Sequence, residues 1–536
     1  MIAETHTVET PLGPVRGTRT VGADRISVFR GIRYAEAPVG TRRFRPPEPT
    51  AAWHSVYDAT VAGPRAIQPP SLLTAAPEPE DEDCLSLNIW TPDVSARQAV
   101  MVWIHGGSFT SGSGSQPYYD GTRLAQRGVV VVSINYRLGA LGFLHLGEFD
   151  DELVGTANLG LQDQTLALAW VRDNIAAFGG DPNRVTLFGE SAGAMSAAVH
   201  LASPGSRGLF RRVIAQSGAA GHVQSAASGT KVAEAVLDAL GLGPGPFGSG
   251  AGRGGHRLLD RLQGVSAAAL RQAVHTVSRQ SVGDTALAFC PTIDGVTISE
   301  HPVESLRSGS SCDVDLLCGT NADEMNLFRV QDLLSGTSEE LNEDRLRRRL
   351  ARALEFWGSS VGLDEALARY RDRYPYQDNS QLWSTISTDT TFRAHMFAMA
   401  DAHAARGRVW SYHFTQPSSA FGGALGACHA VEVPFVFDNL DQPGVEVLLG
   451  ELTPRRRRFA AALADTWAQF ASVDDPSQIR VPATSDCWLR YRTGPRYQAV
   501  LDLDSRQVEG LDADLMSIWV RTPEARSGVE SGKMVS

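Results

Sequence analysis

A serine between an apolar run and a stretch of small residues is the feature of this sequence most able to do chemistry. The apolar run 185–188 leads into Gly189-Glu190-Ser191-Ala192-Gly193, and the small residues of 194–199 follow. This order predicts a strand, a sharp turn and a helix. Glycines two positions before and after the serine permit a strained turn, and the first N–H groups of the helix point at developing negative charge. The context therefore predicts that Ser191 is a nucleophile.

The Gly-x-Ser-x-Gly pattern by itself is a weak signal. With 52 glycines in 536 residues, it arises by chance about once in two or three such chains. A second copy does occur at Gly358–Gly362. It follows Leu354–Trp357, which is typical of the end of a helix, and no helix of small residues leaves it. We therefore interpret Ser360 as part of a turn between helices.

Adjacent glycines upstream could stabilise an oxyanion. His105-Gly106-Gly107 follows the predicted strand Val102–Ile104 directly. Because glycine has no Cβ, the backbone N–H groups of Gly106 and Gly107 can point outward. Together with the N–H of Ala192 they would form a three-donor oxyanion hole. The alternative is an ordinary glycine-rich turn, but the serine downstream favours the oxyanion hole.

A nucleophilic serine also needs a base and an acid that orients the base. In one recurrent chain order the acid follows the serine and a histidine comes last. His429 lies in a loop that enters an apolar segment after a predicted strand, which favours it as the base. The apolar run Leu316–Cys318 is followed by both Asp323 and Glu324. Position alone does not choose between these two acids.

The elements that must carry these residues are predicted by apolar, β-branched runs with helical patterns between them. Such runs are typical of strands buried on both faces of a parallel sheet. Alternation with helices such as Leu161–Phe178 predicts an α/β fold with a doubly wound, mostly parallel central sheet. An antiparallel hairpin within residues 7–17 is expected at one edge. The predicted parallel strands are Ala99–Ile104, Val129–Ile134, Val185–Phe188, Arg212–Ala215, Val314–Cys318 and Val409–Phe414.

The chain shows no long linker or repeat, so we expect residues 1–536 to form a single domain. Residues 218–310 and 326–425 are too long for simple connections. We expect these insertions to form a lid or pocket wall over the carboxyl ends of the strands. The remaining expectations are helices at 338–357, 363–374, 390–406 and 454–472, a strand at 497–503, a glycine-rich surface loop at 241–255 and a disordered tail at 523–536.

Composition limits the possible partners and compartments. The net charge of −11 argues against a nucleic-acid partner. No apolar stretch is long enough to predict a membrane span, and the N-terminus does not resemble a signal peptide. Six scattered cysteines without a CxxC pattern indicate free thiols, no metal site and a cytoplasmic location. Lys231 and Lys533 are the only lysines among many arginines, which indicates GC-rich coding and a bacterial source.

Several motifs in order make the chain resemble the type-B carboxylesterases, which are related to cholinesterases. The resemblance implies an α/β-hydrolase fold and hydrolysis of small-molecule esters through an acyl-enzyme, without a cofactor. It implies Glu324 as the acid of a catalytic triad with Ser191 and His429, while monomer and dimer both stay open. The motifs are Gly31–Ala35, Glu82–Ile89, His105–Gly107, Asn135–Leu138, Gly160–Gln164, Phe178–Pro182, Gly189–Gly193 and Gln216–Gly218.

The sequence departs from this family at several positions. Met325 stands where glycine usually follows the acid, Arg33 replaces a usual proline, and Cys84 has no upstream cysteine to pair with. Residues 66–83 contain no Trp, Tyr or Phe, whereas cholinesterases use a tryptophan there to hold a quaternary ammonium by cation–π contact. We therefore do not expect a cholinesterase.

Three questions stay open at this point. The same residues could cleave carbamates or aryl amides, and a non-catalytic binding protein is a remote alternative. Glu190 could tune His429, order the attacking water or be a buried structural carboxylate. Because the base must be neutral, we expect activity to fall on acidification, with an ionisation of His429 near about 6–7.

Overall fold

The computed structural model describes residues 4–20, 25–70, 78–243, 257–280, 287–336 and 341–519. In these residues a 13-stranded sheet runs in the order β1-β2-β3-β5-β7-β6-β8-β9-β12-β13-β14-β15, with β4 paired to β2. All six predicted strands lie in its parallel part, which confirms the mostly parallel sheet. The parallel strands are β6 (Gln98–Ile104), β7 (Val130–Ile134), β8 (Gly180–Glu190), β9 (Arg212–Gln216), β12 (Asp315–Asn321), β13 (Val409–Phe414) and β14 (Gln498–Leu501).

The sheet becomes antiparallel toward both edges. The predicted N-terminal hairpin is confirmed, because Thr10 pairs with Gly13 across a two-residue turn. The other antiparallel strands, β3, β5 and β15, were not predicted; in β5 the buried residues include the polar Ser86 and Asn88. The antiparallel partners are β1 (Glu4–Thr10), β2 (Gly13–Arg19), β3 (Ser27–Arg33), β5 (Ser86–Thr91) and β15 (Arg506–Val508), while β4 (Tyr57–Asp58) runs parallel to β2.

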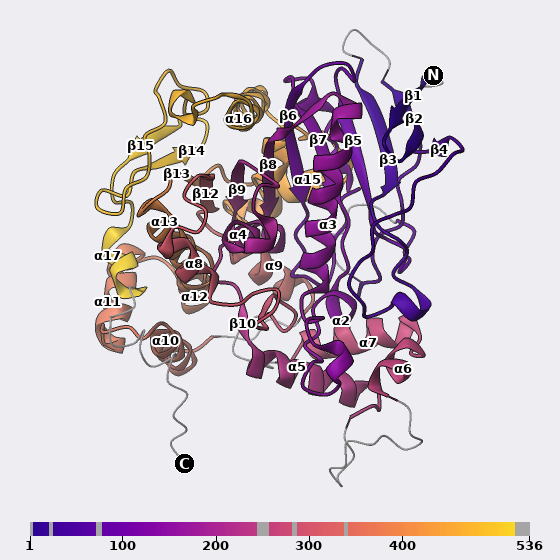
Figure 1. The fold of residues 1–536 in the computed structure, drawn as a ribbon. Coiled ribbons are helices and arrows are strands. Elements are labelled where there is room, and N and C mark those ends of the chain that lie inside the picture. The colour runs from indigo at the N-terminus through magenta and orange to yellow at the C-terminus, as the bar shows by residue number, and fades with distance from the viewer. Residues whose placement is uncertain are drawn as a thin grey trace.

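Both faces of the sheet are buried, which explains its apolar strands. Along β6, Val100 and Val102 belong to one hydrophobic cluster, while Met101 and Trp103 belong to a second cluster on the other face. Helices α3 (Leu159–Asn174) and α4 (Ala192–Ala202) pack in the first cluster, and α16 (Pro454–Ser472) packs in the second. Figure 1 shows α3 and α4 in front of the sheet and α16 at its upper end.

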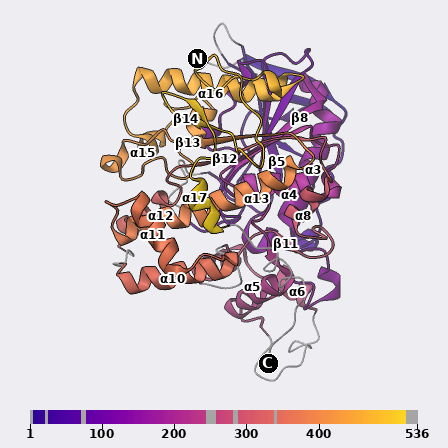
Figure 2. The same cartoon turned by 90° about the vertical axis from the view of Figure 1, so that its left-hand side faces the viewer.

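Two long segments interrupt the run of parallel strands. The views in Figures 1 and 2 place α5, α6 and α10 at the end of the molecule opposite α16. That they form a lid stays a prediction. Between β9 and β12 lie β10 (Gln224–Ser225), α5 (Ala226–Ala239), α6 (Leu258–Gln263), α7 (Ala267–Ser278), β11 (Thr292–Ile293) and α8 (Pro302–Ser308); between β12 and β13 lie α9 (Asn326–Leu334), α10 (Glu343–Trp357), α11 (Leu363–Arg373), α12 (Asn379–Thr388), a π-helical turn (Asp389–Arg393) and α13 (Ala394–Ala404).

The helix predicted at 390–406 begins earlier than expected, because α12, the π turn and α13 are continuous from Asn379 to Ala404. Serine and threonine recur in α12, and both residue types favour helices only weakly. Its start is marked by a capping box between Asp378 and Gln381, which was the signal available in the sequence. The predicted helix 454–472 and strand 497–503 are present as α16 and β14.

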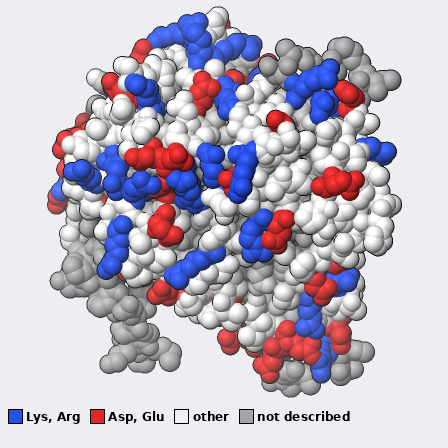
Figure 3. Space-filling model, turned by 45° about the horizontal axis from the view of Figure 1, so that its top comes forward, with Lys and Arg blue, Asp and Glu red and all other residues white. Residues whose placement is uncertain are grey.

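Short helices of four or five residues also occur. The short helices are α1 (Thr122–Ala125), α2 (Gly139–Gly142), α14 (Val433–Val436), α15 (Val445–Leu449) and α17 (Ala513–Met516). In the described ranges, no helix is long and apolar enough to span a membrane. On the face shown in Figure 3, basic and acidic side chains lie interspersed. The expected tail at 523–536 and most of the glycine-rich stretch 241–255 fall outside the described residues.

Candidate active site

The predicted strand, turn and helix around Ser191 are present. Ser191 lies between β8 and α4 with φ 55° and ψ −125°, a conformation that costs a non-glycine residue free energy and is common at functional sites. Its N–H donates to the carbonyl of Gln216 at 2.9 Å. The turn needs its glycines, because a Cβ at Gly193 would lie 1.9 Å from the carbonyl oxygen of Ile104.

The loop after β6 lies against this turn. A Cβ at Gly106 would be 2.8 Å from Oε2 of Glu190 and 3.1 Å from Cβ of Ser191. Gly107 has φ 115°, and Ser108 and Phe109 also have positive φ. Ala192 is the first residue of α4. The structure therefore brings all three predicted oxyanion donors to the elbow, with no side chain between Gly106 and the serine.

His429 meets one of the two candidate acids. Its Nδ1 lies 2.7 Å from Oε2 of Glu324, and both side chains are buried. The other oxygen of Glu324 accepts the N–H of Asn321 at 2.7 Å. Asp323 points elsewhere, since its Oδ2 accepts the N–H of Ala427 at 2.8 Å. The geometry thus separates two acids that sequence position left equal.

The departure at Met325 does not disturb this acid. Met325 has φ −76° and ψ −7°, which any residue adopts, so the position does not require glycine. Its N–H donates to Oγ1 of Thr388 at 3.1 Å. The backbone after Glu324 therefore has an ordinary conformation, and its hydrogen bond to Thr388 anchors it to the neighbouring helix. The departure at Cys84 is also accommodated, because this residue is a buried free thiol.

Glu190 contacts the other nitrogen of His429. Its Oε1 lies 3.0 Å from Nε2 of His429. This is an ion-pair contact without the alignment of a hydrogen bond, and in the described residues Oε1 has no hydrogen-bond partner. Glu190 as a whole is only 3% exposed. A buried oxygen without a bond is costly unless the imidazole it faces carries charge.

The sequence did not reveal a third carboxylate in this cluster. Glu432 is buried and accepts hydrogen bonds from Gln216 Nε2 at 3.1 Å and Asn321 Nδ2 at 2.6 Å. Burial raises the pKa of Glu432, and the charge of Glu324 adds to this shift. The available signal was a single carboxylate in the apolar segment that follows His429.

Burial and crowding change the ionisation of the site. Burial raises the pKa of Glu190 to about 8, with Glu432 and Glu324 adding to the shift and His429 opposing it. Burial by itself lowers the pKa of His429, but Glu190 and Glu324 outweigh it and raise that pKa to about 9. This lies above the range of 6–7 expected from an ordinary histidine. Strongly shifted groups that share a cluster are typical of functional sites.

Two aromatic rings also pack on His429. The centroid of Phe392 lies 4.8 Å from the imidazole centroid, and that of Phe328 lies 5.5 Å away. The second copy of the serine pattern is elsewhere, since Ser360 is exposed between α10 and α11. In the part of the chain that the structure describes, no group of three or more His, Cys, Asp or Glu side chains is placed to hold a metal ion.

Comparisons with known proteins agree on one family. The model of the "Carboxylesterase family" matches residues 4–519. A para-nitrobenzyl esterase of Bacillus subtilis (strain 168) is 38% identical over 508 residues, 92% of this chain and 94% of that protein. A phenmedipham hydrolase of Pseudarthrobacter oxydans is 36% identical over 479 residues, 86% of this chain and 89% of that protein.

A solved structure gives the same result. The carboxylesterase EST55 of Geobacillus stearothermophilus superposes with a TM-score of 0.82 and 37% identity, covering 96% of this chain and 99% of that chain. It shares the α/β-hydrolase fold expected from the sequence. With one family matched over nearly its whole length, this chain belongs to the carboxylesterase family and is a carboxylic ester hydrolase.

Proposed function

We propose that Ser191, His429 and Glu324 form the catalytic triad of this esterase. The contact of 2.7 Å between Nδ1 of His429 and Oε2 of Glu324 carries the proposal. An acid on Nδ1 keeps the proton there, which leaves Nε2 free to act as a base. Nε2 faces Glu190, the residue directly before the nucleophile. This arrangement supports proton transfer between Ser191 and His429.

The reaction then proceeds in two halves. Ser191 Oγ attacks the ester carbonyl while His429 takes its proton, and Glu324 stabilises the imidazolium that forms. The C–O bond to the alcohol breaks as His429 returns this proton to the departing oxygen, which leaves an acyl-serine. Water then attacks the acyl carbon, gives a proton to His429 and releases the acid as Ser191 regains its hydrogen.

The tetrahedral intermediates carry a negative oxygen that needs hydrogen-bond donors. We assign the backbone N–H groups of Gly106, Gly107 and Ala192 to this role. The positive φ of Gly107 and its two successors supports the assignment, because strained turns are retained where function requires them. The N-terminal position of Ala192 on α4 adds the favourable end of the helix dipole.

Glu190 tunes the base in this proposal. Its contact with Nε2 of His429 favours the protonated imidazole that exists between the two proton transfers. That stabilisation is electrostatic, since Oε1 of Glu190 lacks an aligned hydrogen bond. The other two roles considered for Glu190, ordering the attacking water and a purely structural carboxylate, do not depend on a shift in the pKa of His429.

The substrate is a small-molecule ester, and we propose aryl and benzyl esters as its class. The similarity to a para-nitrobenzyl esterase supports this choice. The carbamates and aryl amides considered from the sequence are the second class, and the similarity to a phenmedipham hydrolase adds phenmedipham to the substrates worth testing. Rates on p-nitrobenzyl esters, p-nitrophenyl esters, aryl carbamates, anilides and phenmedipham would decide between the two classes.

Covalent labelling tests the proposed mechanism directly. A p-nitrophenyl ester should give a burst of p-nitrophenol, and mass spectrometry of the quenched protein should place the acyl group on Ser191. Ser191→Ala should show neither signal. An acyl group on Ser360 or on another residue would overturn the assignment.

The proposed location is the cytoplasm. All six cysteines lie in described residues, and no two of them form a disulfide there. Cysteines without disulfides are expected in a reducing compartment. Titration of the denatured protein without reductant should find six thiols.

A further inference from the structure

The helix behind His429 contains an irregular turn. Residues Asp389–Arg393 are π-helical, and the N–H of Ala394 bonds to the carbonyl of Asp389 five residues before it. A single π turn inside an α-helix adds one residue to the turn and is frequent at functional sites. This turn is not explained by proline or glycine, because its sequence is Asp-Thr-Thr-Phe-Arg.

The π turn and the end of α12 hold the loop that carries Glu324. Oγ1 of Thr388 accepts the N–H of Met325, the residue after Glu324, at 3.1 Å. Arg393 Nη2 donates to the carbonyl of Ala322, two residues before Glu324, at 3.4 Å. The acid is therefore bracketed by bonds from one helix to both sides of its loop.

The same turn also contacts the other parts of the site. Phe392 packs on the imidazole of His429 at 4.8 Å between ring centroids, with the planes 37° apart. The carbonyl of Thr391 lies 2.7 Å from Nε2 of His222. His222 belongs to the loop that follows β9, whose last residue, Gln216, accepts the N–H of Ser191. One turn of helix thus touches the segments of the acid, the base and the nucleophile.

Buried polar groups lock this turn in place. Arg393 Nη1 lies 2.6 Å from Oδ1 of Asp389, and both side chains are buried. Tyr370 donates to Oδ2 of Asp389 at 2.7 Å, and Trp519 donates to the oxygen of Tyr370 at 2.8 Å. Breaking one partner of a buried ion pair is costly, whereas the intact pair fixes geometry. The lock therefore makes the turn a rigid support for the loops it touches.

We propose that Thr388 is a positioning residue of the esterase, which sets the acid loop so that Glu324 meets His429, and that the locked π turn is its support. The proposal rests on the triad assigned under Proposed function. Thr388 touches neither substrate nor a reacting atom in this scheme. It acts through the backbone of Met325 and hence through Glu324.

Two helical threonines provide a matched experiment. Thr388→Val removes the hydroxyl that accepts the N–H of Met325 and keeps the side-chain shape. Thr165→Val is the control, because Oγ1 of Thr165 donates only to the carbonyl of Leu161 within its own helix, α3, at 3.0 Å. The burst amplitude with a p-nitrophenyl ester gives the number of active sites, so that kcat per active site and Tm are measured separately for each variant. We expect Thr388→Val to lower kcat per site about tenfold with KM little changed, and Thr165→Val to leave both constants unchanged.

A second matched pair tests the lock. Tyr370→Phe removes the bond to Asp389, while Tyr491→Phe removes an equivalent bond of 2.7 Å to Asp401 on α13. Both variants should lower Tm, but only Tyr370→Phe should lower kcat per titrated site. If both tyrosine variants lose kcat equally, or if Thr388→Val matches Thr165→Val, the positioning role is wrong.

The outcomes separate this proposal from the triad itself. If Ser191→Ala keeps full activity, the triad assignment fails. If Ser191→Ala is inactive while Thr388→Val and Tyr370→Phe turn over like their controls, only the positioning role fails.

Discussion

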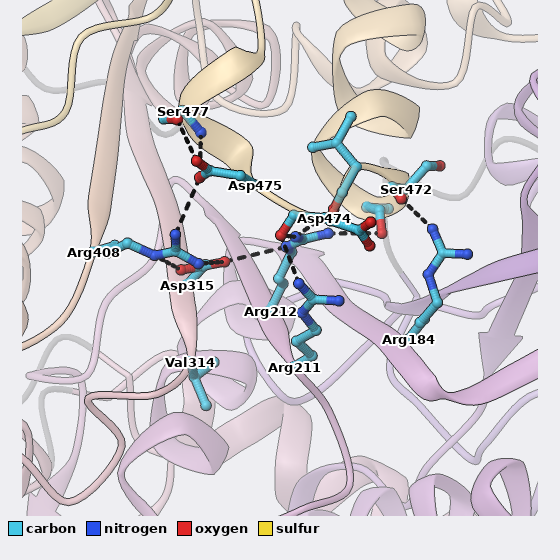
Figure 4. Close-up of polar contacts among 12 residues, drawn as sticks. Arg184, Arg211, Arg212, Val314, Asp315, Arg408, Ser472, Asp474, Asp475 and Ser477 are labelled. Carbon is cyan, nitrogen blue, oxygen red and sulfur yellow. Dashed lines mark hydrogen bonds and ion pairs between the residues drawn. The ribbon is translucent and has the colours of Figure 1, made fainter.

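The two ends of the parallel strands use buried charge in opposite ways. At the carboxyl end, Glu190, Glu324 and Glu432 surround His429, and in the described residues no arginine bonds to any of these carboxylates. At the amino end, Asp315 is bound by two arginines (Figure 4). The first arrangement concentrates like charges, and the second neutralises them.

The amino end is built around the last turn of α16. Arg408 binds both oxygens of Asp315 at 2.6 and 2.9 Å, and Arg212 reaches one of them at 3.3 Å. Arg212 also donates to the carbonyls of Ala471 and Val473 at 2.9 and 2.6 Å. Cations that bond to the last carbonyls of a helix stabilise its C-terminus. Figure 4 shows Arg184 and Arg211 making similar contacts with Ser472 and Asp474.

This difference indicates what each end does. Where opposite charges meet, removing one leaves the others unpaired and costs folding stability. Where like charges meet around a histidine, the pKa values of these side chains shift, and the side chains become available for proton transfer. Variants at the carboxyl end should therefore change rates more than Tm, and variants at the amino end should change Tm more than rates.

Ser191→Ala should lower ester hydrolysis by about 10⁴-fold or more, because it removes the nucleophile. Its Tm should stay close to that of the wild type, since the alanine keeps the backbone turn. Ser360→Ala is the matched control, as this exposed serine repeats the sequence pattern between two helices. Loss of activity in Ser360→Ala with normal Ser191→Ala turnover would reverse the interpretation of the two motifs.

Glu324→Gln should lower kcat by about 10³–10⁴-fold, because an amide cannot hold the productive tautomer of His429. Asp323→Asn should change kcat far less, since Asp323 bonds to the backbone of Ala427 rather than to the imidazole. Steady-state rates and Tm of both variants check this. A larger rate loss at Asp323 would reassign the acid.

Much of this arrangement could be predicted from the sequence, because it depends on local patterns. Strands buried on both faces leave continuous apolar runs, and the elbow at Ser191 leaves glycines at fixed spacing. The choice of Glu324 over Asp323 rested on resemblance alone, since neighbouring carboxylates differ only in where the backbone aims them. In the structure, the contact of 2.7 Å between Glu324 and His429 shows that Glu324 is the carboxylate directed at the imidazole.

The features that the sequence did not reveal depend on distant partners. Glu432 is bonded by Gln216 and Asn321, which precede it by about two hundred and one hundred residues. The helix α12 is rich in serine and threonine, which favour helices only weakly, so its sequence predicted a helix less clearly than the sequences of its neighbours did. The ionisation of His429 was expected near that of a free imidazole, whereas the carboxylates of Glu190 and Glu324, which the fold brings against its two ring nitrogens, raise its pKa.

Asp315→Asn should lower the free energy of unfolding by about 3 kcal/mol, because it leaves two arginines without their buried carboxylate. The kcat per active site should stay within about twofold of the wild type, since the cluster lies at the end of the strands away from Ser191. Denaturant unfolding and burst titration measure the two quantities. Asp181→Asn is a milder control, because the partner of Asp181, Arg97, is largely exposed. If Asp315→Asn lost kcat without losing stability, the proposed difference in role between the two ends of the strands would be wrong.

Glu190→Gln should move the acid limb of the kcat/KM profile to lower pH. Burial lowers the pKa of His429, and the carboxylates of Glu190 and Glu324 raise it above its ordinary value. Removing the charge of Glu190 therefore lowers this pKa, and the base stays neutral further into the acid range. An opposite charge at this distance shifts a pKa by about one unit or more, so a displacement of that size is expected. The exposed pair of Glu48 with Arg42 supplies the control, since Glu48→Gln should leave the profile in place. A midpoint that stays fixed or rises in Glu190→Gln would show that Glu190 does not tune His429 and that the crowded carboxylates are as structural as Asp315.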